Sequence, residues 1–229
     1  MKINKEVYKM ATFEKATVGE KISNYVENRQ NVLIAILAVV VAAVIAYTVA
    51  VTVTSKANTK GLAAIDTISY VMTQESASLS EEELETRRNK ALEDLSAYLE
   101  KGGIVGVRAN MLAGEIYYSV KDFENSAKCW TSAAAKGKKS YTAPLAYFNA
   151  AVSYENINDL DNAEKYYKYA VSAKDFLMAS HAEFSLGRVR EAKGDTDGAI
   201  EAYRSLLGKN PDTSWGNLAK TRLIALGAE

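Results

Sequence analysis

The hydrophobic pattern divides the chain into one long apolar run and a series of amphipathic helices. Residues 31–54 (NVLIAILAVVVAAVIAYTVAVTVT) contain no charged residue. As a helix at about 1.5 Å per residue, this run crosses the roughly 30 Å hydrocarbon core of a bilayer. A buried helix of a soluble protein would carry a polar stripe, and a cleaved signal peptide would have an apolar region of only about 7–15 residues. We therefore expect residues 31–54 to be a transmembrane signal anchor.

Basic residues are more frequent before the apolar run than just after it, where only Lys56 and Lys60 stand in the first stretch. The basic residues before the run are Lys2, Lys5, Lys9, Lys15, Lys21 and Arg29. Since positively charged flanks stay in the cytoplasm, we expect residues 1–30 to be a short cytoplasmic amphipathic segment. This segment fits either a helix at the lipid headgroups or a docking helix. Residues 55–229 are then expected in the periplasm, as the exported part of a single-pass protein of the bacterial inner membrane.

The part after the run shows helical spacing of apolar residues and no alternating strand pattern, which predicts an all-α domain. A helix pair is expected at residues 56–101. Its second helix opens with a capping box formed by Ser80 and Glu83, and it stops at Gly102 and Gly103.

From about residue 107 the sequence repeats with a spacing of 36–37 residues. Each copy has a first helix with Ala at a matched position (Ala109, Ala146 or Ala182) and Gly or Ala five residues later, and then a turn that contains Asp. A second helix follows, with a small, an aromatic and an apolar residue at matched positions: Ser126, Trp130 and Ala133; Ala163, Tyr167 and Ala170; Ala199, Tyr203 and Leu206. We expect repeats at about 107–141, 143–178 and 180–211, and a capping helix at 213–227.

These positions resemble the tetratricopeptide repeat (TPR), which has a period of about 34 residues. The third copy is nearest to the family pattern, with Leu186, Gly187, Gly194, Asp195, Ala199, Ile200, Tyr203 and Pro211. The first helix of a TPR usually begins with a large residue, which is Tyr147 in the second copy but Asn110 and Glu183 in the others. The resemblance implies a TPR-type α-solenoid of about three repeats after a single N-terminal transmembrane helix, with a preceding helix pair and a C-terminal capping helix.

The residue inventory points away from catalysis. The chain has one histidine, His181, one cysteine, Cys129, and no motif of a hydrolase, a P-loop or a metal site. Its formal net charge is zero, so nucleic-acid binding has no electrostatic support. We expect no enzyme activity, no cofactor, no metal and no small-molecule substrate.

Function is therefore expected on the surface, because the first helices of stacked TPRs line a concave groove. The repeat register assigns to this protein-binding groove Arg108, Met111, Glu115, Tyr118, Leu145, Phe148, Val152, Glu155, His181, Phe184, Arg188 and Glu191. An apolar groove of this kind binds a helix or an unfolded segment, unless residues 56–100 cover it.

The order of anchor, helix pair, repeats and capping helix resembles the YfgM-like family of TPR proteins of the bacterial inner membrane. The resemblance implies a non-enzymatic scaffold in protein export and periplasmic folding, with translocon subunits, periplasmic chaperones or unfolded clients as partners. The alternatives are a structural, self-assembling subunit of an envelope machine for motility, secretion or division, and a regulatory enzyme subunit.

Overall fold

The computed structural model describes residues 17–228, which form helices and contain no strand. The expected all-α fold is confirmed. The helices are α1 (Val18–Thr73), the 3-10 turn η1 (Ser76–Ser78), α2 (Glu81–Leu99), α3 (Gly103–Ser119), α4 (Phe123–Lys136), α5 (Ala143–Asn156), α6 (Leu160–Val171), α7 (Ala179–Ala192), α8 (Thr196–Lys209) and α9 (Ser214–Ala225). The chain forms two compact units, Met1–Lys56 and Ala57–Glu229.

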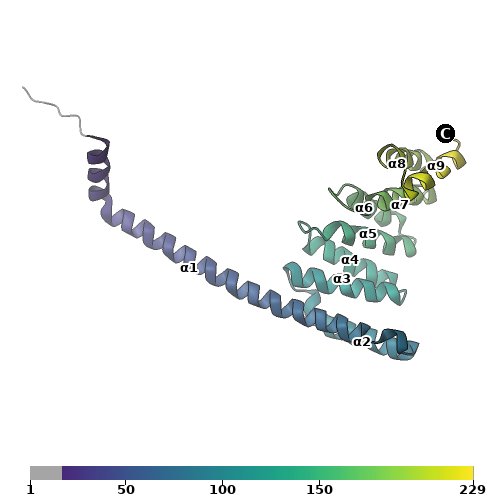
Figure 1. Ribbon diagram of the computed structural model, residues 1–229, viewed down its shortest axis with the longest axis horizontal. Helices are drawn as coiled ribbons and strands as arrows, with labels where there is room; N and C mark the ends of the chain where they lie inside the picture. Colours follow the sequence, from purple (N-terminus) through teal and green to yellow (C-terminus); the bar gives the residue numbers. More distant parts are fainter. Residues whose placement is uncertain (1–16, 229) are drawn as a thin grey trace, which may run out of the picture. The chain divides into compact units, whose positions relative to one another are not determined.

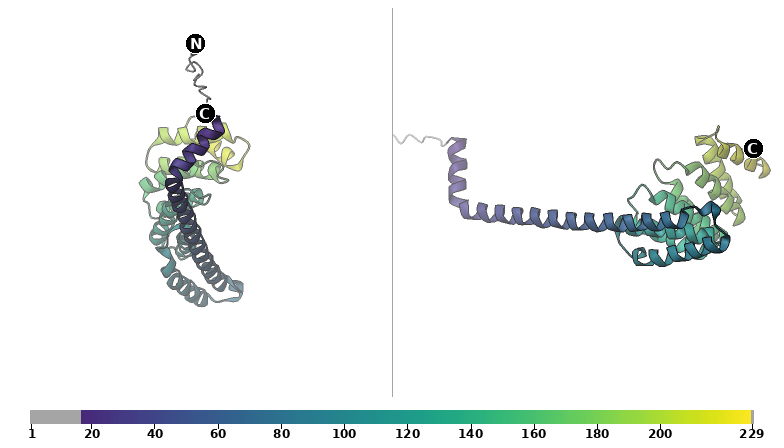
Figure 2. Two further views of the ribbon diagram at one scale, coloured as in Figure 1. Left: turned by 90° about the vertical axis from the view of Figure 1, so that its left-hand side faces the viewer. Right: turned by 60° about the horizontal axis from the view of Figure 1, so that its bottom comes forward.

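The first unit contains the beginning of α1. Thr17 and Glu20 form a capping box, with the Thr17 N–H donating to Glu20 Oε2 at 2.8 Å and the Glu20 N–H donating to Thr17 Oγ1. The helix bends near its beginning, where Arg29 has non-helical backbone angles (Figure 2). The apolar run that follows is exposed along its length and is long and apolar enough to span a membrane. The basic residues Lys2, Lys5, Lys9 and Lys15, on which the predicted orientation depends, lie outside the described residues.

The second unit opens with the end of α1, which packs with α2 and α3. Ile65 and Leu95 are completely buried in this core, and Gly61 lies so close to Val105 that a Cβ atom would come within 2.9 Å of its side chain. Ser80 and Glu83 form the predicted capping box of α2. The next helix, α3, begins at Gly103 rather than near residue 107, because two glycines suffice to reverse the chain.

The turn between the two helices of each repeat has the same backbone geometry and the same N-cap residue. Asp122, Asp159 and Asp195 are the N-caps of α4, α6 and α8, and each carboxylate accepts a hydrogen bond from the backbone N–H three residues later. The residues just before these caps have left-handed backbone angles, with φ of 62° at Lys121, 60° at Asn158 and 81° at Gly194. The aspartates that the sequence places at matched positions therefore start the second helix of each repeat.

The two helices of a repeat approach closely where a glycine faces an aromatic ring. A Cβ atom on Gly187 would lie 2.5 Å from Cε1 of Tyr203, and one on Gly114 would lie 2.8 Å from Nε1 of Trp130. Tyr167 of the middle repeat is also completely buried. These contacts hold α3 to α9 in a solenoid in which each helix packs against the next one in the chain (Figure 1).

Candidate protein-binding groove

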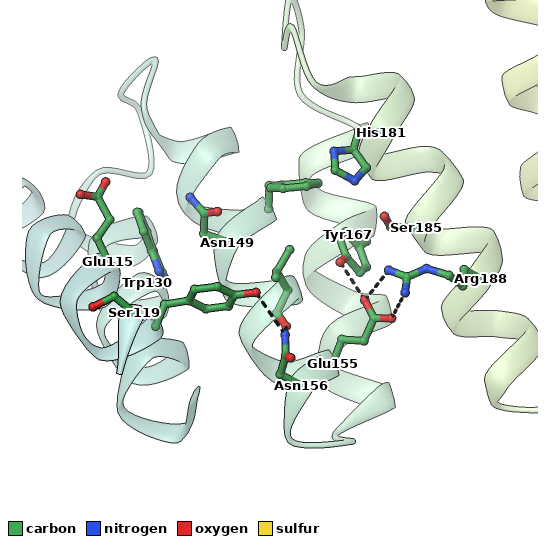
Figure 3. A pocket seen from close by; sticks show the side chains of 13 residues that line it. Glu115, Ser119, Trp130, Asn149, Glu155, Asn156, Tyr167, His181, Ser185 and Arg188 are labelled. Carbon is green, nitrogen blue, oxygen red and sulfur yellow. Dashed lines mark hydrogen bonds and ion pairs between the residues drawn. The ribbon is translucent and has the colours of Figure 1, made fainter. Parts of the chain in front are cut away.

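A groove of about 870 Å³ crosses the repeats (Figure 3). Most of its walls come from the first helices, α3, α5 and α7, while the rings of Trp130 and Tyr167 reach it from α4 and α6. The residues that line it are Glu115, Tyr118, Ser119, Trp130, Phe148, Asn149, Val152, Glu155, Asn156, Tyr167, His181, Ser185 and Arg188. Among the described residues, none from 56–100 contributes to this lining.

A polar cluster joins two repeats at one side of the groove. Arg188 on α7 forms an ion pair with Glu155 on α5 at 2.8 Å, and the Tyr167 hydroxyl donates to the same carboxylate at 3.0 Å. Burial and the neighbouring Glu155 charge both raise the pKa of Tyr167, so its hydroxyl keeps its proton. Figure 3 shows Tyr167 and Arg188 converging on Glu155.

The same cluster recurs in the next repeat, where the Tyr203 hydroxyl donates to Glu191 and Arg222 pairs with that carboxylate. Hydrogen bonds from Arg222 lower the pKa of Glu191 most, burial opposes the effect, and Tyr203 adds to it. Arg222 comes from the C-terminal helix α9 rather than from the first helix of another repeat. Glu191 does not line the groove, unlike Glu155.

The C-terminal helix covers the third repeat. The Trp215 ring on α9 stacks on His181 with ring centroids 4.0 Å apart, and its centroid lies 5.5 Å from that of Phe184. Burial, followed by the charge of Arg188, lowers the pKa of His181 below its usual 6.5, so this ring is neutral at pH 7. Within the described chain, residues 56–100, the alternative cover that the sequence left open, do not line the groove, whereas α9 packs on its third-repeat side.

Seven predicted residues line the groove, namely Glu115, Tyr118, Phe148, Val152, Glu155, His181 and Arg188. The structure places the other five elsewhere. Arg108 lies 3.6 Å from Asp66, and Met111 belongs to the core with 8% exposure. Leu145 lines a separate cleft beside the connection between α4 and α5, while Phe184 and Glu191 contact α9. These positions differ because a first helix packs on both neighbouring helices and leaves only a narrow strip for the groove.

Six lining residues were not predicted: Ser119, Trp130, Asn149, Asn156, Tyr167 and Ser185. The sequence places Trp130 and Tyr167 only at the aromatic position of the second helices, whereas in the structure their buried rings, with 2% and 0% exposure, lie beneath the groove. The asparagines had a visible signal, since Asn149 and Asn156 continue the helical spacing of Leu145 and Val152 on one face of α5.

Two polar groups of the groove are not used by the fold. Within residues 17–228, the Asn149 side chain makes no hydrogen bond, and the Glu115 carboxylate has neither a hydrogen bond nor an ion pair. Burial raises the pKa of Glu115, and the Arg108 charge partly opposes this. Both groups are therefore open to a bound molecule. Within the same residues, no group of three or more His, Cys, Asp or Glu side chains is placed to hold a metal ion.

Comparison with known proteins identifies the repeats. Residues 111–177 and 148–214 each match the tetratricopeptide repeat model. A TPR repeat-containing protein of Treponema pallidum (strain Nichols) is 29% identical over 135 residues, which make up 59% of this chain and 56% of the relative. The chain thus aligns with little more than half of that relative. The predicted TPRs are confirmed, while neither match refers to the YfgM-like family.

Proposed function

We propose, from the tetratricopeptide repeats that the chain carries, that it is a non-enzymatic scaffold that binds a segment of another protein in its groove. The scaffold is anchored in a bacterial inner membrane by residues 31–54 and works in the periplasm. Its proposed role is ancillary to protein export and periplasmic folding, in line with the resemblance to YfgM-like proteins.

The observation that carries this proposal is the groove of about 870 Å³ across three first helices. TPR helices in general present such surfaces to proteins. The groove runs from α3 to α7, and at its third-repeat end Trp215 on α9 packs against His181 and Phe184 of α7.

The chemistry of the lining favours a polypeptide with apolar and basic side chains. Half-buried Val152 offers apolar contact, above the buried rings of Phe148 and Tyr167. The free amide of Asn149 carries both a donor and an acceptor, so it can pair with a peptide group of a bound segment. The unpaired Glu115 carboxylate favours a Lys or Arg on that segment. Unfolded or newly exported proteins supply segments of this kind.

Site-specific photocrosslinking in intact cells tests the proposal. The photoreactive residue is placed at Asn149 or Asn156 in the groove, and at Lys165 on the outer face of α6 as a matched control. We expect translocon subunits, chaperones or unfolded envelope proteins to be captured from the two groove positions and not from Lys165. Capture of only other copies of the chain, or of the parts of one fixed machine, contradicts the scaffold proposal and favours a structural subunit.

The membrane topology needs a separate test. In spheroplasts, an added protease is expected to digest residues 55–229 while a tag fused before residue 17 stays protected. Protection of the repeats contradicts the periplasmic location, and it leaves the groove chemistry untouched.

A further inference from the structure

The connections between helices in the second unit lie at two opposite edges, because each helix runs antiparallel to the next (Figure 1). We call the edge that holds residues 100–102, 137–142 and 172–178 the inter-repeat edge. The edge that holds residues 74–80, 120–122, 157–159 and 193–195 is called the turn edge. The two edges differ in charge and in exposed side chains.

Contacts link the connections of the inter-repeat edge to the beginning of the second unit. Lys136 at the end of α4 lies 3.8 Å from Glu100 at the end of α2. Ala57 and Lys60 share a small cleft with Lys101 and Gly102. The residues at which the chain enters the second unit therefore lie at the inter-repeat edge.

Lysines outnumber acidic residues at the inter-repeat edge, where Glu100 and Asp175 also lie. Its exposed lysines make no ion pair within residues 17–228; they are Lys60, Lys101, Lys138, Lys139 and Lys174. The turn edge carries Lys121 and Lys193 but more acidic residues, since the first turns of α2, α4, α6 and α8 hold Glu81, Glu82, Glu83, Glu124, Asp161 and Asp197. The first turns of α3, α5 and α7 have no acidic residue.

The most exposed apolar side chains of the repeats stand among these lysines. Leu177 is 100% exposed and Tyr141 is 92% exposed. Apolar residues on the turn edge are less exposed, with 43% for Val120 and 40% for Ile157. Tyrosine is favoured at the headgroup level of a bilayer, and lysines near a bilayer are attracted by anionic lipids.

We propose that the inter-repeat edge docks on the surface of the bilayer that holds the anchor. Tyr141 and Leu177 enter the headgroup region, and the lysines contact anionic headgroups. The short connection to the anchor favours the bilayer as the docking partner. Only Lys56 separates the end of the uncharged run at Ser55 from Ala57, which starts the second unit. A short tether holds the edge at a high effective concentration near lipid, so weak contacts suffice. This inference rests on the proposed anchor and is independent of the groove.

The test uses the full chain in nanodiscs of phosphatidylcholine, with or without phosphatidylglycerol, that contain a nitroxide-labelled lipid as a fluorescence quencher. A fluorophore is attached to Tyr141→Cys or Leu177→Cys on the inter-repeat edge. Asp197→Cys on the turn edge is the matched control. Cys129 is buried, and the unchanged chain serves as the labelling blank.

We expect the lipid to quench the probes at positions 141 and 177 strongly, and more so with phosphatidylglycerol, while the probe at 197 is quenched little. The triple variant Lys138→Glu, Lys139→Glu, Lys174→Glu should reduce quenching at 177 to the level of the control. Equal quenching at both edges, or quenching that ignores lipid charge, overturns the inference. Quenching that rises with the number of chains in each disc favours contact between copies and overturns it too.

The failure of the anchor can be told apart from the failure of this inference. A chain that does not enter the nanodiscs contradicts the anchor and, with it, membrane docking. A chain that enters them but shows no lipid quenching at 141 or 177 contradicts docking alone. Neither result affects groove crosslinking from Asn149.

Discussion

The Tyr167 hydroxyl donates a hydrogen bond across 3.0 Å to the Glu155 carboxylate, which lies on the other helix of the same repeat. Thirty-six residues later, Tyr203 and Glu191 repeat the arrangement. The first repeat has Trp130 at the tyrosine position, which cannot donate in the same way. The second and third repeats thus share a polar contact that fixes how the ring sits between their helices.

Loss of this contact should lower stability without opening a large cavity. We expect Tyr167→Phe to reduce the free energy of unfolding by about 1–2 kcal/mol, because a buried hydrogen bond to a charged group is lost while Arg188 still pairs with Glu155. Urea denaturation followed by circular dichroism measures this. Tyr169→Phe on the same helix is the control, since Tyr169 is 47% exposed, and it should change stability little. Equal effects of the two changes would show that the hydroxyl of Tyr167 contributes nothing specific.

The glycines of the chain give a sharp test of the helix contacts. Gly187→Ala should destabilise the fold by about 1–3 kcal/mol, because its Cβ atom would lie 2.5 Å from the Tyr203 ring, and Gly187→Leu should prevent folding. Gly208 is also in a helix but has open space around it, so Gly208→Ala should stabilise by about 0.5 kcal/mol through helix propensity. The melting temperature should fall for Gly187→Ala and rise for Gly208→Ala. A shift in the same direction for both variants would contradict the repeat register.

Groove residues should separate into those that build the core and those that bind. Phe148 is 4% exposed, so Phe148→Glu should cost about 3 kcal/mol or more and unfold part of the solenoid. Asn149→Ala should leave the free energy of unfolding within about 0.5 kcal/mol and reduce capture by a crosslinker at Asn156. Circular dichroism and capture yield are measured on the same samples. Full capture by the Asn149→Ala variant would remove this amide from the binding site.

Acid should weaken the contact between the second and third repeats through Glu164. Burial is the largest influence and favours the neutral acid, but hydrogen bonds from Lys168, Lys193 and Arg190 outweigh it and lower the pKa of Glu164 from 4.5 to about 2. A lowered pKa in the folded state stabilises the fold above the unfolded value near 4.5, and this stabilisation is lost as the pH falls toward 2.

Glu164→Gln should therefore destabilise the protein at pH 7 by roughly 2 kcal/mol, with a difference from the unchanged chain that shrinks below pH 4.5. Urea denaturation between pH 7 and pH 3 follows the difference. Glu201→Gln is the control, because its side chain is 79% exposed and lies 3.4 Å from Arg190. A difference that stays constant with pH would exclude the ionised Glu164 as the cause.

Cys129 should be chemically inert in the folded protein. Burial and the Asp122 charge raise its pKa from 9.0 to about 11, which lowers the thiolate fraction at pH 8 by about 100-fold, and burial blocks access as well. We expect a thiol reagent to react slowly at pH 8 and quickly in denaturant, as followed by absorbance. Rapid reaction without denaturant would show that α4 opens readily from α3.

The repeats could be predicted because their signals are local. Asp122, Asp159 and Asp195 start helices through a bond to a backbone N–H three residues away, and Ser80 with Glu83 does the same for α2. Small and aromatic residues at fixed spacing also indicate which faces must touch. Such signals are contained within a few residues, so one sequence is enough to find them.

The groove was predicted less completely because its extent depends on contacts between distant segments. The sequence pattern does not indicate that Trp215 stacks on His181, or that Arg222 of α9 forms an ion pair with Glu191. The burial of Met111 depends on the packing of the neighbouring repeat, which the pattern of α3 alone does not show. The anchor and its orientation remain predictions from composition and charge.

The left-handed residue and the aspartate cap in each turn have a consequence for the way the chain folds. Every repeat contains the residues that end its first helix and begin its second, so folding can start in any repeat and spread to its neighbours. A solenoid of this kind forms mostly from contacts that are close in sequence, which favours rapid folding. Damage to one turn should accordingly open the chain locally, and a repeat on either side can serve as the template from which it closes again.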